Sequence, residues 1–112
     1  MSQYFQVGDR VLWSPANRVA ELFYSQAEAL VPAAGVPHGI GPKHNDEYDI
    51  DPVAFAAFVQ RLVERYEHHG HLVLRTLIHG FVATALVLAE WGLSDTPTDH
   101  LALIPRTEWL AI

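Results

Sequence analysis

The sequence predicts an α+β fold in which three helices form the core and a small antiparallel β-sheet lies on one side. Three observations predict it. Residues 72–89 form a run with few polar side chains, which is typical of a buried helix. Residues 52–69 carry apolar side chains at helical spacing, and two short β-prone runs occupy residues 4–7 and 10–13. We therefore expect a single α+β domain over residues 1–112, with the last helix buried at its centre.

The N-terminal part of the chain has the pattern of a hairpin followed by a helix. Gly8 and Asp9 separate the two β-prone runs, as the turn of a β-hairpin requires. Ser14 and Pro15 then form a helix-start signal, because serine caps free amides and proline fits the first helical turn. Apolar residues recur after them at three- and four-residue spacing, and Pro32 is expected to end this helix.

The middle of the chain is predicted to be a long loop that leads into the clearest amphipathic helix. Residues 33–51 are rich in glycine and polar side chains without a sustained period, and loops of this length are often binding segments. Asp51 and Pro52 form a second helix start of the same kind. Gly70 lies where a left-handed helix cap belongs, so the second and third helices are expected to form an antiparallel hairpin.

The third helix is predicted to belong to a protein core. Arg75 and His79 shorten its uncharged run below the length of a membrane span. Gly80 lies among small residues and is expected to let a neighbouring element approach closely. In the C-terminal part, a third strand is favoured over a short helix at residues 101–104, because a strand would complete the sheet and cover Trp109.

Length, charge and cysteine content limit the class of protein. The chain has 112 residues, half of them apolar, which suffices to bury one core. Thirteen acids against seven bases give a net charge of -6, and the absence of a basic patch argues against nucleic-acid binding. The chain has no cysteine, which suits a reducing compartment, and its N-terminal residues lack a signal-peptide pattern. We expect a cytoplasmic protein with no cofactor and no membrane association.

Four carboxylates, those of Asp46, Glu47, Asp49 and Asp51, lie close together in the predicted loop. They do not match a calcium-binding loop, because Pro52 stands where the sharp turn needs glycine and no bidentate glutamate follows. Two interpretations remain. The acids are either solvated residues that favour the N-terminus of the following helix, or a recognition surface for a basic partner.

A second polar cluster, at the joint of the second and third helices, includes Glu64, His68 and His71. Carboxylate and imidazole are ordinary ligands of divalent metals, and the first two residues lie one helical turn apart. The HExxH pattern is absent, however, and histidines at a helix C-terminus are favourable through the helix dipole alone. The cluster supports an alternative hypothesis of a small metal-dependent or acid–base enzyme, with His38 or His44 on a loop that acts as a lid.

Three stretches of the sequence carry a resemblance to known proteins: SQYFQVGDRVLWSPANRVAELF, DEYDID and FVQRLVERY. Together they are similar to a family of small, uncharacterised, single-domain bacterial proteins. The resemblance covers the whole chain. It implies no activity, and it assigns no catalytic or binding residue to any position of this sequence.

The function that the sequence favours is a non-catalytic interaction protein. No phosphate-binding glycine motif and no serine nucleophile elbow is present. The protein would act as a neutralising or accessory partner of a basic protein through its acidic loop. Trp13, Trp91 and Trp109, together with the apolar third helix, also predict a homodimer, because soluble proteins rarely expose large apolar patches.

Overall fold

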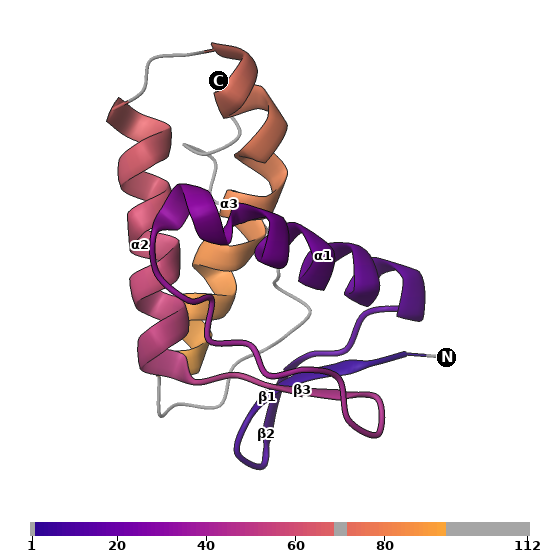
Figure 1. The fold of residues 1–112 in the computed structure, drawn as a ribbon. Coiled ribbons are helices and arrows are strands. Elements are labelled where there is room, and N and C mark those ends of the chain that lie inside the picture. The colour runs from indigo at the N-terminus through magenta and orange to yellow at the C-terminus, as the bar shows by residue number, and fades with distance from the viewer. Residues whose placement is uncertain (1, 69–71, 94–112) are drawn as a thin grey trace.

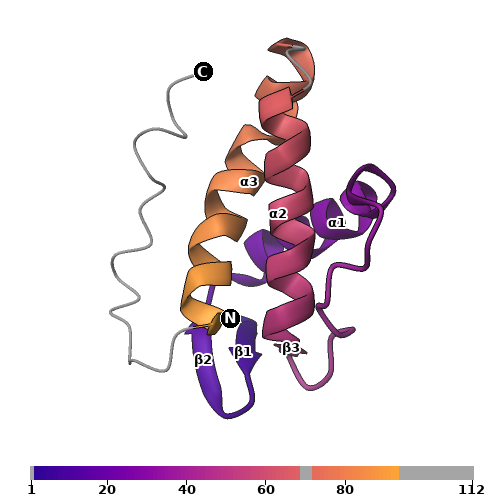
Figure 2. The same ribbon diagram turned by 90° about the vertical axis from the view of Figure 1, so that its left-hand side faces the viewer.

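The computed structural model describes residues 2–68 and 72–93 and has an α+β fold, which confirms the predicted class. The elements follow one another in the order β1, β2, α1, β3, α2, α3. Figure 1 shows α2 and α3 running antiparallel side by side, with α1 crossing them and the sheet below. Figure 2 shows the same pairing of α2 and α3 from another side. The bounds of the six elements are β1 Tyr4–Val7, β2 Arg10–Trp13, α1 Asn17–Ala34, β3 Glu47–Asp49, α2 Pro52–His68 and α3 Leu72–Leu93.

The sheet contains the predicted hairpin and a third strand at an unexpected place. β1 pairs with β2 in the antiparallel sense and with β3 in the parallel sense, so the sheet is mixed and has the order β2-β1-β3. The prediction of a purely antiparallel sheet and of a structureless segment over residues 33–51 was therefore wrong. Tyr48 explains the pairing, because it is buried and its ring stacks on Phe5 with the centroids 4.6 Å apart. The strand expected at residues 101–104 lies outside the described residues.

Helix α1 begins later and ends later than its proline residues suggest. The helix starts at Asn17 with Ala16 in the N-cap position, so Ser14 does not cap it. Pro15 is bonded to the N-terminal segment instead, because the Gln3 amide donates to the Pro15 carbonyl at 3.0 Å. Pro32 lies inside the last turn and does not end the helix. Gly35 closes that turn in the left-handed conformation, and Arg61 donates from Nε to the Ala34 carbonyl at 3.2 Å. Tertiary contacts thus hold a turn that the proline would weaken.

The second helix begins as predicted. The Asp51 carboxylate accepts hydrogen bonds from the amides of Val53 and Ala54, both at 3.1 Å, so it caps α2 in the manner of an N-cap aspartate. Arg10 of β2 caps the C-terminal end of α3, where its guanidinium donates to the carbonyls of Trp91 and Gly92. The predicted cap at Gly70 lies outside the described residues.

Aromatic side chains from the sheet, from α1 and from α3 meet in the core. Phe5 of β1 packs edge-on against Phe23 of α1, and Phe23 stacks on Phe81 of α3 at 4.8 Å. Trp13 belongs to the same cluster, because it stacks on Phe5 and meets Phe23 edge-on. Trp91 is half-buried and packs against the core, and neither tryptophan is among the exposed large apolar side chains of the described residues. Trp109 lies outside the described residues, and homodimerisation stays a prediction.

Helix α3 is central, although it is not covered on every side. Among the described residues, the stretch Arg75–Leu93 alone is long and apolar enough to cross a membrane, and just over half of it is buried in the structure. The core helix of a water-soluble domain has the same character. The prediction for Gly80 was wrong: it is exposed, and no described atom lies within 4 Å of a Cβ added there. Small residues in this helix do not mark a close approach at that point.

We predict that Gly80→Ala stabilises the protein by about 0.5–1 kcal/mol, because alanine restricts the unfolded chain and fits a helix better than glycine does. Urea denaturation of the two proteins measures the difference. A lower free energy of unfolding for the variant would mean that another element does pack against this position.

Candidate functional site

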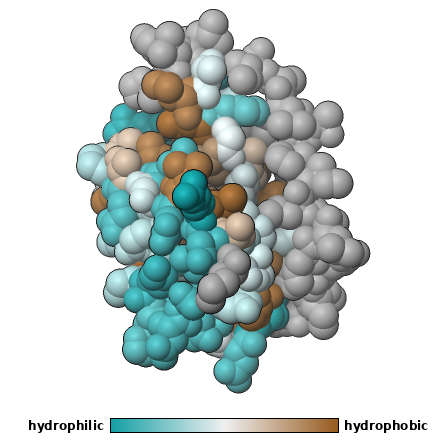
Figure 3. Space-filling view, turned by 90° about the vertical axis from the view of Figure 1, so that its right-hand side faces the viewer, coloured by the Kyte–Doolittle hydropathy of each residue, from teal (hydrophilic) through white to brown (hydrophobic). Residues whose placement is uncertain are grey.

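The four predicted carboxylates lie on one continuous stretch that runs from a turn through β3 to the start of α2. We call Asp46, Glu47, Asp49 and Asp51 together the acidic segment. Asp46, Asp49 and Asp51 are exposed and Glu47 is half-buried. The turn before β3 extends to the lower right in Figure 1, and Figure 3 shows hydrophilic residues gathered at the lower left of the face on that side.

A two-residue turn presents Asp46 at the tip of this stretch. The backbone groups of His44 and Glu47 exchange two hydrogen bonds, both of 2.9 Å, and the two residues between them have positive φ. Asn45 has φ 51° and Asp46 has φ 61°, the combination that a type I′ hairpin turn requires. Asparagine is common in that conformation, while the second position favours glycine. Asp46 therefore occupies a left-handed position for which glycine is the commonest residue.

The alternation of β3 separates its two acids from its aromatic residue. Tyr48 points into the core, where burial raises the pKa of its phenol, and its neighbours Glu47 and Asp49 lie on the other face. Gln6 on β1 lies between the two acids and donates from Nε2 to Glu47 Oε1 at 3.3 Å and to Asp49 Oδ1 at 2.9 Å. Because the glutamine side chain is neutral, it orients both carboxylates without cancelling their charge.

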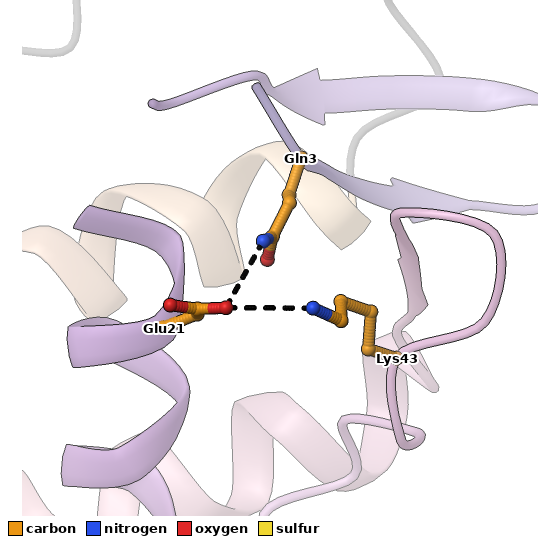
Figure 4. A network of polar contacts seen from close by, with 3 residues as sticks. All are labelled: Gln3, Glu21 and Lys43. Carbon is orange, nitrogen blue, oxygen red and sulfur yellow. Dashed lines mark hydrogen bonds and ion pairs between the residues drawn. The ribbon is translucent and has the colours of Figure 1, made fainter. Parts of the chain in front are cut away.

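The one lysine of the chain does not neutralise the acidic segment. Figure 4 shows Lys43 and Gln3 both directed at Glu21 of α1, whose Oε2 atom lies 3.4 Å from Lys43 Nζ and from Gln3 Nε2. Within residues 2–68 and 72–93, none of the four carboxylates of the acidic segment forms an ion pair. No paired cation therefore offsets the charge of the acidic segment within this part of the structure.

An open cleft of about 690 Å³ lies beside the acidic segment. Its apolar wall is formed by Val31, Pro37, Ile40 and Ile50. Its polar residues are Glu28 and His38, together with Asp49 and Asp51 of the acidic segment. The cleft thus combines an apolar surface with carboxylates at its edge, which suits the long aliphatic stem and charged end of a lysine or arginine side chain.

His38 in this cleft is held by its neighbours on both ring nitrogens. The amide of Ile40 donates to Nδ1 at 2.9 Å, which assigns the proton of the neutral ring to Nε2. That nitrogen lies 3.6 Å from Glu28 Oε2, and the ring packs edge-on against Tyr24. Burial, followed by the hydrogen bond to Glu28 and its charge, raises the pKa of Tyr24 to about 12. In this geometry His38 has no free lone pair and does not suit the role of a general base.

Sequence reasoning missed the group formed by Tyr24, Glu28 and His38. The only local signal was the four-residue spacing of the first two on α1, which places them on one face of a helix. Nothing in the sequence brings residue 38 to that face. His79, in contrast, is hydrogen-bonded within the helix pair, with Nδ1 2.8 Å from the hydroxyl of buried Tyr66.

The alternative metal cluster is only partly covered by the structure. Glu64 is exposed on α2, one turn before His68, which ends the helix. The side chain of His68 and the whole of His71 lie outside the described residues. Within the described residues, no three histidine, aspartate or glutamate side chains are close enough to hold a metal ion together. The metal-dependent alternative stays a prediction.

Comparison with known proteins gives one match. A family model described as "Family of unknown function (DUF6086)" matches residues 1–103. No curated protein and no solved structure matches the chain. The expectation of an uncharacterised family is confirmed, while its bacterial origin stays a prediction.

We predict that Gly39→Ala destabilises the protein by at least about 2 kcal/mol, because it combines left-handed strain with a steric clash. Gly39 has φ 76°, and an added Cβ would lie 2.8 Å from the Phe55 amide nitrogen. Gly35→Ala is the matched control, since Gly35 has φ 77° and its added Cβ would meet only Arg61, at 3.6 Å. Equal losses in urea denaturation would show that residue 39 does not pack tightly on α2.

We also predict that Tyr24 makes stability fall at alkaline pH. Its folded-state pKa of about 12 lies above the ordinary 10.0, so the unfolded phenol ionises first as the pH rises. The stabilisation from Tyr24 is therefore complete below pH 10 and lost as the pH rises to about 12. Urea denaturation over this range should show a shallower decline for Tyr24→Phe than for wild type or the exposed control Tyr4→Phe. Parallel declines for all three proteins would contradict the assignment.

Proposed function

The chain belongs to this family of unknown function, and we propose that it is a non-catalytic interaction protein that binds a basic partner through the acidic segment. The observation that carries the proposal is a run of four carboxylates, three of them exposed, that have no ion-pair partner among the described residues. Clustered charge of one sign attracts a partner of opposite charge and raises its association rate. The protein would act in the cytoplasm as a neutralising or accessory partner.

Rigid support of the carboxylates favours this role. Asp46 is placed by a hydrogen-bonded turn, Glu47 and Asp49 by strand pairing and Gln6, and Asp51 by the amides of α2. Binding groups that are already held in place lose little conformational entropy when a partner binds. The acidic segment therefore has the preorganisation that a recognition surface needs, in contrast to carboxylates on a freely moving loop.

The cleft beside the segment adds a contact that charge alone does not supply. A lysine or arginine of the partner could place its aliphatic stem on the wall near Ile40 and Ile50 and its charged group near Asp49 or Asp51. Asp46 supports the same interpretation, because a carboxylate occupies a left-handed turn position for which glycine is the commonest residue.

The test is a double variant, Asp46→Asn with Glu47→Gln, which removes two charges and keeps the shape of the segment. Asparagine accepts the left-handed conformation at residue 46, and glutamine at residue 47 retains an oxygen that can accept from Gln6. A pull-down from the protein's own cell extract identifies the partner. We then expect roughly threefold to tenfold slower association for the variant at low salt, with a nearly unchanged melting temperature.

The matched control is Glu64→Gln with Glu67→Gln, which removes the same charge from two exposed positions on α2. Association of this control should remain close to that of wild type. Equal slowing by both double variants would assign the effect to net charge. Wild-type association that does not change with salt would contradict electrostatic recognition.

A further inference from the structure

A second groove, largely apolar, lies between α2 and α3. It has a volume of about 280 Å³ and is lined by Ala56, Val59, Val63, Leu86, Ala89 and Leu93, with Gln60 and Glu90 also at its surface. Val59 and Ala89 are buried, whereas Leu93 is 56% exposed. Apolar surface of this kind is unfavourable in water and is ordinarily covered by another part of a protein.

The chain itself continues from this groove. Leu93 is both the last residue of α3 and one of the residues that line the groove. Residues 94–99 have the sequence SDTPTD, and each of these residue types is found in turns. The apolar run LALI follows at residues 101–104. A chain that reverses after α3 would bring this run back along the helix pair.

The lengths agree with such a reversal. From Leu86 to Leu93 the helix rises about 10 Å at 1.5 Å per residue, and four extended residues cover about 13 Å. The family match supports the same segment, because it extends beyond α3 to residue 103 and so includes Leu101 and Leu103. The sequence pattern of the family therefore does not stop where the described helix ends.

We infer that residues 101–104 of the same chain dock in the α2–α3 groove and cover it with leucine and isoleucine side chains. The groove is then part of the fold of a single chain. It is neither a site for a separate partner nor a contact with a second copy. Docking also shields Leu93, whose exposure would otherwise leave a large apolar side chain in water.

Cross-linking of the full chain tests this inference, because the natural sequence has no cysteine. The test protein carries Gln60→Cys at the exposed rim of the groove and Ala102→Cys in the docking segment. A short bismaleimide cross-linker should join the two within one chain in dilute solution. The control protein carries Ser25→Cys, at an exposed position on α1, with the same Ala102→Cys, and should form at least about tenfold less of the intramolecular product.

Two results would overturn the inference. Equal intramolecular cross-linking of the test and control pairs would show that the segment has no preferred place. Cross-linking of the Gln60→Cys pair only between chains would assign the groove to a second copy.

Discussion

The stacking of Tyr48 on Phe5 is the contact on which the acidic surface depends. Both side chains are buried, and their rings lie 4.6 Å apart at an interplanar angle of 8°. Such pairs contribute about 0.5–1.5 kcal/mol beyond the area that they bury. Because side chains alternate along a strand, the burial of Tyr48 directs Glu47 and Asp49 to the opposite face. One aromatic contact in the core thus sets the direction of two charges at the surface.

The segment after β3 converts this strand contact into a fixed connection to the helix pair. The amide of Ile50 donates to the Gln6 carbonyl and that of Asp51 to the Gly39 carbonyl, both at 2.8 Å. Asp51 then caps α2, while Gly39 lies so close to the first turn of that helix that a side chain would clash. The turn, the strand and the helix start therefore form one supported unit, and Asp49, Ile50 and Asp51 of this unit line the cleft.

The parts of this unit that the sequence predicts are those with local causes. Asp51 followed by Pro52 predicts the start of α2, because the cap and the amides that it binds are only a few residues apart. β3 escaped prediction because its single apolar residue, Tyr48, stands between acids and is stabilised by Phe5, which is distant in sequence. The prediction that Pro32 ends α1 was wrong for a similar reason, since Arg61 of α2 binds the carbonyl of Ala34 in the last turn of that helix.

The charge of the acidic segment at the surface depends on which groups contact its carboxylates. Lys43 pairs with Glu21 of α1, while Gln6 and the amides of α2 hold three members of the acidic segment. An ion pair would orient a carboxylate and cancel its charge at once, whereas a neutral donor orients it and leaves the charge in place. Gln6 therefore holds Glu47 and Asp49 in place without offsetting their charge, whereas the N-terminus of α2 holds Asp51 and partly offsets its charge. A solvated acidic loop needs no such support, and the combination of rigid support with carboxylates that lack an ion-pair partner among the described residues is what favours recognition of a basic partner.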